Sequence, residues 1–514
     1  MAKKKNKEES LVPKDEKTLK MEGVQNLYNF LFEACNILRG PVSQDNFKDY
    51  ITPILYFKRI SDVYDEETQT ALEESGGDEE YASLPEQHRF VIPDGCHWSD
   101  IRERSENLGA AIVGAMRGIE LANPDTLYGV LSMFSAQKWT DKKNLSDGKI
   151  RDLIEHLSTR RLGNNDYPAD LMGDAYEILL KKFADDSKAQ AGEFYTPRSV
   201  VSLLVRILDP KPGETVYDPA CGTAGMLLEC IEQVKQKGGD FRTLKLYGQE
   251  KNLTTSTIAR MNMFLHGVED FHIERGDTLR EPKFFEYDLM KQFNIVTANP
   301  PFSLSNWGSE LWADDIYGRN IAGIPPKGNG DMAWVQHMIK SMDETTGRVA
   351  VVLPHGALFR KNAEAKIRSV LLKNDLLEAV IGLGENIFYG ATLSACIMVF
   401  RAQKDADRKG KFIFIDAADQ VRKGRAQNTL EPEHIQTIYQ WYRDFKDVKN
   451  HAKIVTLAEV EANNFNLNIP LYVEKEIEDN LPTLEEAKAQ LKVAMQEAWE
   501  AEERFKQLLT EFTK

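Results

Sequence analysis

The chain has 514 residues, which is too long for one hydrophobic core and predicts two or three domains. It is 42% hydrophobic, has no run of 18 apolar residues, and begins with charged residues that no signal-peptide core follows. We therefore expect a globular cytoplasmic protein without membrane contact. The net charge of −15 argues against a chain that grips DNA unaided, because phosphate neutralisation dominates DNA affinity.

The five cysteines are scattered without CxxC spacing, and none of the nine histidines falls in an HExxH pattern. This distribution favours a reducing compartment and predicts neither disulfides nor a metal site.

Two regions precede the first predicted strand. Residues 1–20 are charged and nearly devoid of apolar side chains, which predicts a disordered basic tail. From 21 to 165, apolar residues recur at three-and-four spacing, as in the series Leu27, Phe30, Leu31 and Ala34. This periodicity predicts an N-terminal helical domain, in which we find no recognisable chemistry.

Strands and helices alternate across residues 166–425, which predicts an α/β domain with a doubly wound, Rossmann-like sheet. The expected strands cover residues 215–217, 244–249, 271–273, 293–298, 348–353, 377–383, 395–401 and 412–416. In front of the first strand, Thr196 is predicted to cap a helix that starts at Pro197.

Residues 426–514 are expected to be helical. Thr483 and Glu486 have the spacing of a capping box, and Leu484, Leu491, Ala498, Phe505 and Phe512 recur every seven residues after it. Such a heptad stripe predicts docking on a partner helix, and its terminal place favours a helix of another chain.

Acidic residues follow three consecutive strands. Asp218 opens the small-residue loop Asp218–Gly225, which lets a ligand approach the backbone closely but lacks the phosphate-binding GxxxxGK[ST] pattern. Glu250 ends the second strand, where an acid can accept hydrogen bonds from ribose hydroxyls. Asp277 follows the third strand and is placed to contact an adenine ring. Together they predict a site for a nucleoside whose tail is not a phosphate.

The fourth strand ends in Asn299-Pro300-Pro301-Phe302. The Asn299 side-chain carbonyl and the Pro300 main-chain carbonyl can accept both N–H bonds of an exocyclic base amine, which frees the nitrogen lone pair. Pro301 stiffens the loop, and Phe302 offers a stacking face to a base flipped out of a duplex. Catalysis would then rest on positioning and electrostatics, without a metal or a covalent intermediate.

These residues resemble the amino-methyltransferases that use S-adenosylmethionine and carry an (Asn/Asp/Ser)-Pro-Pro-(Tyr/Phe) signature. Within that group the chain is similar to the modification subunits of type I restriction–modification systems. The resemblance covers most of the chain and rests on Asp49–Asp62, Leu171–Glu177, Gly192–Arg198, Asp218–Gly225, Gly248–Glu250, Gly276–Leu279, Asn299–Phe302 and Asn466–Tyr472.

The resemblance implies N6 methylation of adenine in double-stranded DNA. It assigns the target base to Asn299, Pro300, Pro301 and Phe302, with no metal. It assigns S-adenosylmethionine to Glu193, Phe194, Tyr195, Thr196, Pro197, Arg198, Asp218, Gly222, Thr223, Ala224, Gly225, Glu250 and Asp277. Ala224 departs from the family pattern, because many members have glycine there.

The resemblance also implies partners. A separate specificity subunit would read the DNA sequence, a second copy of this chain would help to clamp the duplex, and joining by a restriction (nuclease/translocase) subunit is left open. The acidic net charge agrees with this division of labour, and so does the lack of a block after residue 405 large enough to read sequence.

Two alternatives stay open. A stand-alone methyltransferase acting on cytosine N4 or on a protein glutamine would present a similar planar amine or amide to the Asn-Pro-Pro-Phe loop. A scaffold that has lost catalysis is the third interpretation, and the intact Asn299 and Glu250 argue against it.

Overall fold

The computed structural model describes residues 16–127, 129–131, 136–186, 196–268, 270–388, 394–424, 427–475 and 482–512. Two compact units divide the chain, Met1–Val473 and Glu474–Lys514. No helix in the described ranges is both long and apolar enough to cross a membrane.

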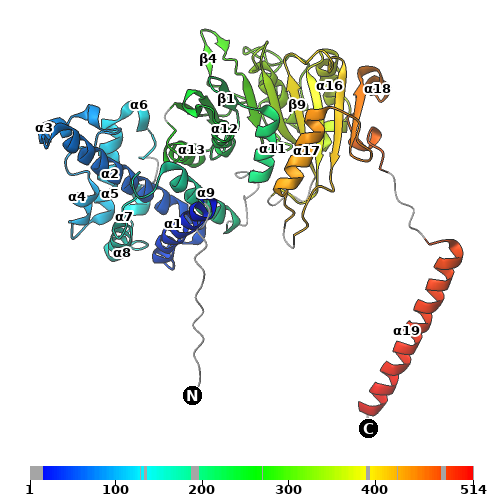
Figure 1. The fold of residues 1–514 in the computed structure, drawn as a ribbon, viewed down its shortest axis with the longest axis horizontal. Coiled ribbons are helices and arrows are strands. Elements are labelled where there is room, and N and C mark those ends of the chain that lie inside the picture. The colour runs from blue at the N-terminus through cyan, green and yellow to red at the C-terminus, as the bar shows by residue number, and fades with distance from the viewer. Residues whose placement is uncertain are drawn as a thin grey trace. The chain divides into compact units, whose positions relative to one another are not determined.

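Helices alone form the first part of the larger unit, as predicted (Figure 1). They share one apolar core, in which Leu31 of the first helix and Ile54 of the second are fully buried. Their bounds are α1 (Glu16–Leu38), α2 (Lys48–Ser75), α3 (Glu79–Ala82), α4 (Trp98–Arg102), α5 (Leu108–Ala122), α6 (Pro124–Leu127), α7 (Ala136–Thr140), α8 (Asp147–Ser158) and α9 (Ala169–Asp186).

A nine-stranded sheet follows, in the order β11-β10-β8-β9-β7-β6-β1-β2-β3. The strands are β1 (Thr215–Asp218), β2 (Lys245–Glu250), β3 (Phe271–Arg275), β6 (Ile295–Ala298), β7 (Arg348–Pro354), β8 (Leu377–Leu383), β9 (Ala395–Arg401), β10 (Lys411–Ala417) and β11 (Ala452–Thr456). Strand β9 runs antiparallel to β7 and β8, and β11 runs antiparallel to β10. A separate hairpin, β4 (Phe285–Glu286) and β5 (Leu289–Met290), lies between β3 and β6 in the chain.

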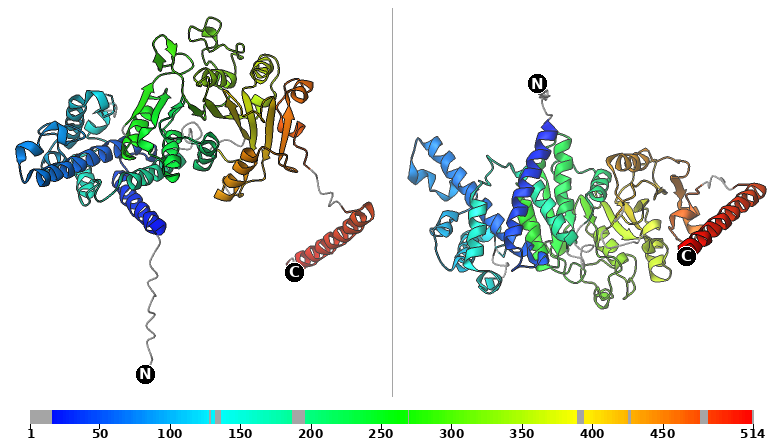
Figure 2. Two further views of the ribbon diagram at one scale, coloured as in Figure 1. Left: turned by 45° about the horizontal axis from the view of Figure 1, so that its top comes forward. Right: turned by 90° about the horizontal axis from the view of Figure 1, so that it is seen from below.

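Helices cover both faces of the sheet (Figures 1 and 2). Successive side chains of a strand point to opposite faces, so Ala350 and Val352 of β7 join one core while Val349 and Val351 join the other. The first core includes α11 (Arg198–Leu208), α12 (Gly225–Gln236), α13 (Leu253–Leu265) and α17 (Pro432–Asp444). The second includes α14 (Asp331–Lys340), α15 (Gly356–Phe359), α16 (Ala363–Lys373) and α18 (Leu457–Ala462). The doubly wound α/β prediction is confirmed.

The strand order reverses between β1 and β6. From β1 the chain moves outward to β2 and β3, and it then returns to place β6 and β7 on the other side. The two strands are parallel, with Val216 beside Ile295 and Tyr217 beside Val296. Ligands of open α/β sheets bind outside the carboxyl ends of the strands at such a switch point. Asp218 and Asn299 therefore sit on the two sides of the expected crevice.

The prediction that residues 426–514 are helical is wrong for β11, which pairs with β10 at the edge of the main sheet. A five-residue edge strand carries too short a pattern to stand out between two helices. Helix α17 also belongs to the larger unit, where Ile438 and Tyr442 pack in the sheet core.

The smaller unit contains α19 (Leu484–Phe512). Its capping box is confirmed, since Thr483 N–H donates to Glu486 Oε2 over 2.8 Å and Glu486 N–H donates to Thr483 Oγ1 over 3.3 Å. Leu491 and Phe505 of the heptad stripe are about three-fifths exposed (61% each). What this stripe packs against stays a prediction.

Candidate active site

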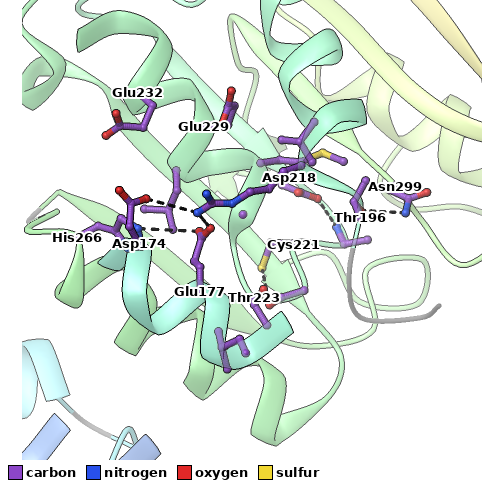
Figure 3. A pocket seen from close by; sticks show the side chains of 18 of the residues that line it. Asp174, Glu177, Thr196, Asp218, Cys221, Thr223, Glu229, Glu232, His266 and Asn299 are labelled. Carbon is purple, nitrogen blue, oxygen red and sulfur yellow. Dashed lines mark hydrogen bonds and ion pairs between the residues drawn. The ribbon is translucent and has the colours of Figure 1, made fainter. Parts of the chain in front are cut away.

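A cavity of about 240 Å³ opens at the carboxyl ends of β1 and β6 (Figure 3). Its wall combines the loop after β1 with side chains from α9, α11 and α12 and with His266, which directly follows α13. Predicted site residues in this wall are Thr196, Arg198, Asp218, Gly222, Thr223, Gly225 and Asn299. Acidic side chains that the sequence analysis did not single out also line it, namely Asp174, Glu177, Glu229 and Glu232.

The loop after β1 is tightly wound around a buried carboxylate. Asp218 Oδ1 accepts the Ala220 N–H over 3.0 Å. Burial raises the pKa of Asp218 to about 8; the Ala220 N–H opposes this rise, and the nearby Glu250 carboxylate adds to it. Gly222 (φ +54°) and Ala224 (φ +68°) both adopt left-handed backbone conformations. For the alanine this costs about 1 kcal/mol, which explains why glycine would suit this position.

Ala224 is also the N-cap of α12, and its methyl side chain makes no capping hydrogen bond. The first N–H groups of α12 are consequently left for a ligand. Gly248 of β2 allows the loop to approach the sheet closely, because a Cβ at this position would lie 2.9 Å from Cys221 Sγ.

Glu250 joins the second strand end to this loop. Its carboxylate accepts the N–H of Gly222 over 3.1 Å and the N–H of Asn252 over 2.7 Å. Burial raises the pKa of Glu250. The side chain therefore supports the loop backbone. Neither Glu250 nor Asp277 is among the residues that line the cavity, so their contacts with ribose and adenine stay predictions.

The end of the third strand contributes a threonine contact as well as the acidic Asp277. Asp277 is paired with Lys251 over 2.8 Å. The next residue, Thr278, donates its hydroxyl to the Pro219 carbonyl over 2.6 Å and so joins the first and third strand ends. On the other side of the loop, Asn262 of α13 donates Nδ2 to the Thr223 carbonyl over 2.9 Å. The sequence analysis missed Thr278 and Asn262, since a threonine or asparagine carries no local sign of such a distant partner.

The Asn-Pro-Pro-Phe loop (residues 299–302) lies directly beside the β1 loop. Asn299 Nδ2 donates to Thr196 Oγ1 over 3.0 Å, whereas the buried Asn299 Oδ1 has no hydrogen-bond partner among the described residues. Pro300 is buried and Pro301 is exposed. The sequence predicts that Phe302 offers a stacking face to a flipped base. Phe302 is half-buried and packs edge to face on Phe388, with ring centroids 6.0 Å apart.

The predicted cap at Thr196 is wrong. Pro197 occupies the N-cap position and α11 begins at Arg198. The Thr196 hydroxyl is instead the acceptor that orients Asn299. Arg198 forms ion pairs with Glu177 and, over 3.5 Å, with Asp174, both on α9 (Figure 3). The predicted cofactor residues Glu193, Phe194 and Tyr195 lie outside the described residues.

Within the described ranges, no group of three or more His, Cys, Asp and Glu side chains could hold a metal ion. Fold and site together place the chain in the class of α/β proteins whose ligand cavity lies at the switch point of an open, doubly wound sheet.

Comparison with known proteins identifies the family. The model of the N-6 DNA methylases matches residues 168–480, and the model of the HsdM N-terminal domain matches residues 27–157. The methylase subunit of the type I restriction enzyme MjaVIII from Methanocaldococcus jannaschii is 31% identical, over 90% of this chain and 80% of that protein. The MjaVII methylase subunit from the same organism is 35% identical, over 70% of this chain and 61% of its own length.

A solved structure agrees. The methyltransferase subunit of a type I restriction–modification system from Streptococcus thermophilus superposes with a TM-score of 0.77 at 27% identity, covering 88% of this chain and all of that one. The chain belongs to the N-6 DNA methylase family, among the methylase subunits of type I restriction enzymes. This bears out the prediction of an adenine-specific DNA methyltransferase subunit, and it does not favour the cytosine N4 or glutamine alternatives.

Proposed function

We propose that this chain transfers the methyl group of S-adenosylmethionine to N6 of adenine in double-stranded DNA, and that the Asn-Pro-Pro-Phe loop receives the flipped base. One observation carries the proposal. The Asn299 side-chain carbonyl is buried at the switch point without a partner among the described residues, while its amide nitrogen is held by Thr196. A buried unpaired acceptor costs free energy, which a substrate N–H would recover.

The chemistry follows from this acceptor. The adenine amine is a weak nucleophile, since its lone pair is delocalised into the ring. Hydrogen bonds from the amine to Asn299 Oδ1 and to the Pro300 carbonyl favour a tetrahedral nitrogen and localise the lone pair. These acceptors are already oriented before the base arrives, and they act in a partly dry site where such interactions are strong. The proton leaves to solvent after the transfer.

We assign the cofactor to the β1 side of the same cavity, where S-adenosylmethionine supplies an electrophilic methyl group. The residues present fit it. Small side chains and left-handed Gly222 and Ala224 let a ligand reach the backbone. The acidic side chains of the wall suit a cofactor that carries positive charge at its sulfonium and its amine. Glu250 and Asp277 complete the proposed nucleoside contacts, and Thr196 and Arg198 line the same cavity.

The proposal extends to partners and domains. Other subunits would complete the enzyme on DNA, namely a separate specificity subunit, a second copy of this chain and, in a nuclease complex, a restriction subunit. The net charge of −15 supports this, because a chain so acidic needs help to hold a duplex. We propose residues 21–165 as the helical domain and 166–425 as the methyltransferase domain, to whose sheet and core β11 and α17 also belong. Within the remaining stretch to 514, we propose α19, which offers the exposed apolar stripe, as the docking element. Action on DNA would place the complex in the cytoplasm.

The test uses the purified chain with its specificity partner, duplex DNA and S-adenosylmethionine labelled in the methyl group. We expect label at adenine N6 after digestion to nucleosides. Asn299→Ala should lower transfer by about 10²–10³-fold while cofactor binding persists. Asn374→Ala, at an exposed asparagine after α16, is the matched control. Unchanged transfer by the Asn299 variant would refute the mechanism, and methylation by the chain alone would refute the division of labour.

A further inference from the structure

A buried carboxylate holds the residue that follows the Asn-Pro-Pro-Phe loop. Ser303 donates its backbone N–H to Asp331 Oδ1 over 2.8 Å. Asp331 is fully buried at the start of α14, and Arg360 neutralises it with an Nη1–Oδ2 distance of 2.7 Å. Arg360 Nη2 also donates to Ser303 Oγ over 3.1 Å. Asp331 and Arg360 thus hold Ser303 by its main chain and its side chain.

Several contacts fix the position of the Arg360 guanidinium, although 28% of the side chain is exposed. Nη1 also donates to the buried Glu364 over 3.3 Å. The Arg360 main chain is fixed by the buried Arg368, which donates to the Arg360 carbonyl over 2.7 Å and to the Ala357 carbonyl over 3.0 Å. A Cβ at Gly356 would lie 2.6 Å from Arg360 Nη2, so a larger residue there would displace the guanidinium from this position.

Ser303 itself is strained. Its φ of +51° is left-handed, which costs a non-glycine residue about 1 kcal/mol. Such a conformation persists only where the surroundings over-determine it. The contacts of Asp331 and Arg360 supply that constraint. Leu304, the residue after Ser303, is held as well, because its carbonyl accepts the Gly330 N–H over 2.9 Å. The turn at Ser303 sets the direction in which the chain leaves Phe302.

We propose that Arg360, acting through Asp331 and Ser303, is a positioning residue that holds the Asn-Pro-Pro-Phe loop in its productive geometry. The inference rests on the proposed function, since it assumes that the loop receives the base. Without the guanidinium, Asp331 becomes a buried charge without its counterion, and Ser303 loses one of its two restraints. A displacement of about 1 Å at a reacting group can lower a rate by about 10²-fold.

The first test replaces Arg360 by Met, which keeps the length of the side chain and removes its donors. We expect kcat to fall by about 10²-fold while the dissociation constant for S-adenosylhomocysteine stays within twofold. Arg360→Lys should recover part of kcat, because it restores the charge without the forked geometry. Lys361→Met, at the exposed neighbour, is the matched control and should behave as the wild type.

The second test needs no activity. Hydrogen exchange of peptides that span residues 299–305 should be faster in Arg360→Met than in the wild type or in Lys361→Met. Ser303→Ala, which keeps the backbone contact, should lower kcat by about fivefold. This milder variant decides the matter if Arg360→Met fails to fold.

Three results would overturn the inference: an unchanged kcat, unchanged exchange, or an equal loss of cofactor binding and kcat, which would indicate a general structural role. A wild-type complex that does not methylate DNA would instead refute the proposed function. The hydrogen-exchange experiment would still show whether Arg360 restrains residues 299–305.

Discussion

Glu250→Gln tests how the second strand end supports the cofactor loop. The change keeps the size of the side chain and removes its charge and one acceptor oxygen. In the wild type the two carboxylate oxygens accept from Gly222 and from Asn252, at 3.1 and 2.7 Å. A glutamine can satisfy one of these N–H groups, and its amide NH₂ then faces the other. The loop after β1 should therefore loosen where the cofactor is expected.

The magnitude follows from the hydrogen bonds. A hydrogen bond to a charged group contributes roughly 1.5–3 kcal/mol, so the loss of one should lower the free energy of unfolding by about 2 kcal/mol. If Glu250 also accepts from the ribose, cofactor affinity falls by a similar amount, which corresponds to about 10–100-fold. The effect on stability should vary with pH. Burial raises the pKa of Glu250 in the folded chain. Ionisation therefore opposes folding as pH rises from the ordinary carboxyl range towards the raised value, and glutamine removes this slope.

Calorimetry with S-adenosylhomocysteine gives the affinity, and urea denaturation at several pH values gives the stability. Glu274→Gln, at an exposed position of the neighbouring strand β3, is the matched control and should change neither quantity. An affinity within twofold of the wild type in Glu250→Gln would show that the ribose assignment is mistaken. A stability equal to that of the control would contradict the supporting role as well.

Three further changes probe the same fold. Ala224→Gly should raise the free energy of unfolding by about 0.5 kcal/mol, because the steric cost of a left-handed alanine exceeds the extra conformational entropy that glycine loses on folding. A lower free energy of unfolding, measured by urea denaturation, would contradict this. The folded pKa of Asp218 is about 8, so wild-type stability should fall as pH rises from 4 to 8, and Asp218→Asn should flatten that slope in thermal scans. Glu378→Gln weakens the buried contacts of Glu378 with Arg401 (2.6 Å) and Arg408 (3.1 Å). It should lower the free energy of unfolding, measured by urea denaturation, by about 3 kcal/mol. A decrease below about 1 kcal/mol would mean that water reaches these ion pairs.

The sequence alone determined the alternation of strands and helices in the main sheet as far as β10 and the loops predicted to carry chemistry, but not the hairpin β4–β5 or the edge strand β11. Period-two and period-three-to-four patterns are local, so they can be read before the chain folds. The acids at 218, 250 and 277 and the amide at 299 each follow a recognisable strand, and parallel strands bring their carboxyl ends to one edge. Their convergence at the switch point was therefore predicted without coordinates, and of the four residues the structure brings Asp218 and Asn299 into one cavity wall.

Tertiary structure decided how those residues are held. Thr196 looked like a helix cap and became the acceptor for Asn299, a partner 103 positions away. Edge strand β11, the Thr278 hydroxyl and the contact of Arg360 with Ser303 are likewise set by partners distant in sequence. Local propensity cannot register such partners, because the contact exists only once the sheet has brought the loops together. The sequence thus predicted the groups that we propose act on the base, and the folded chain determined which residues hold them.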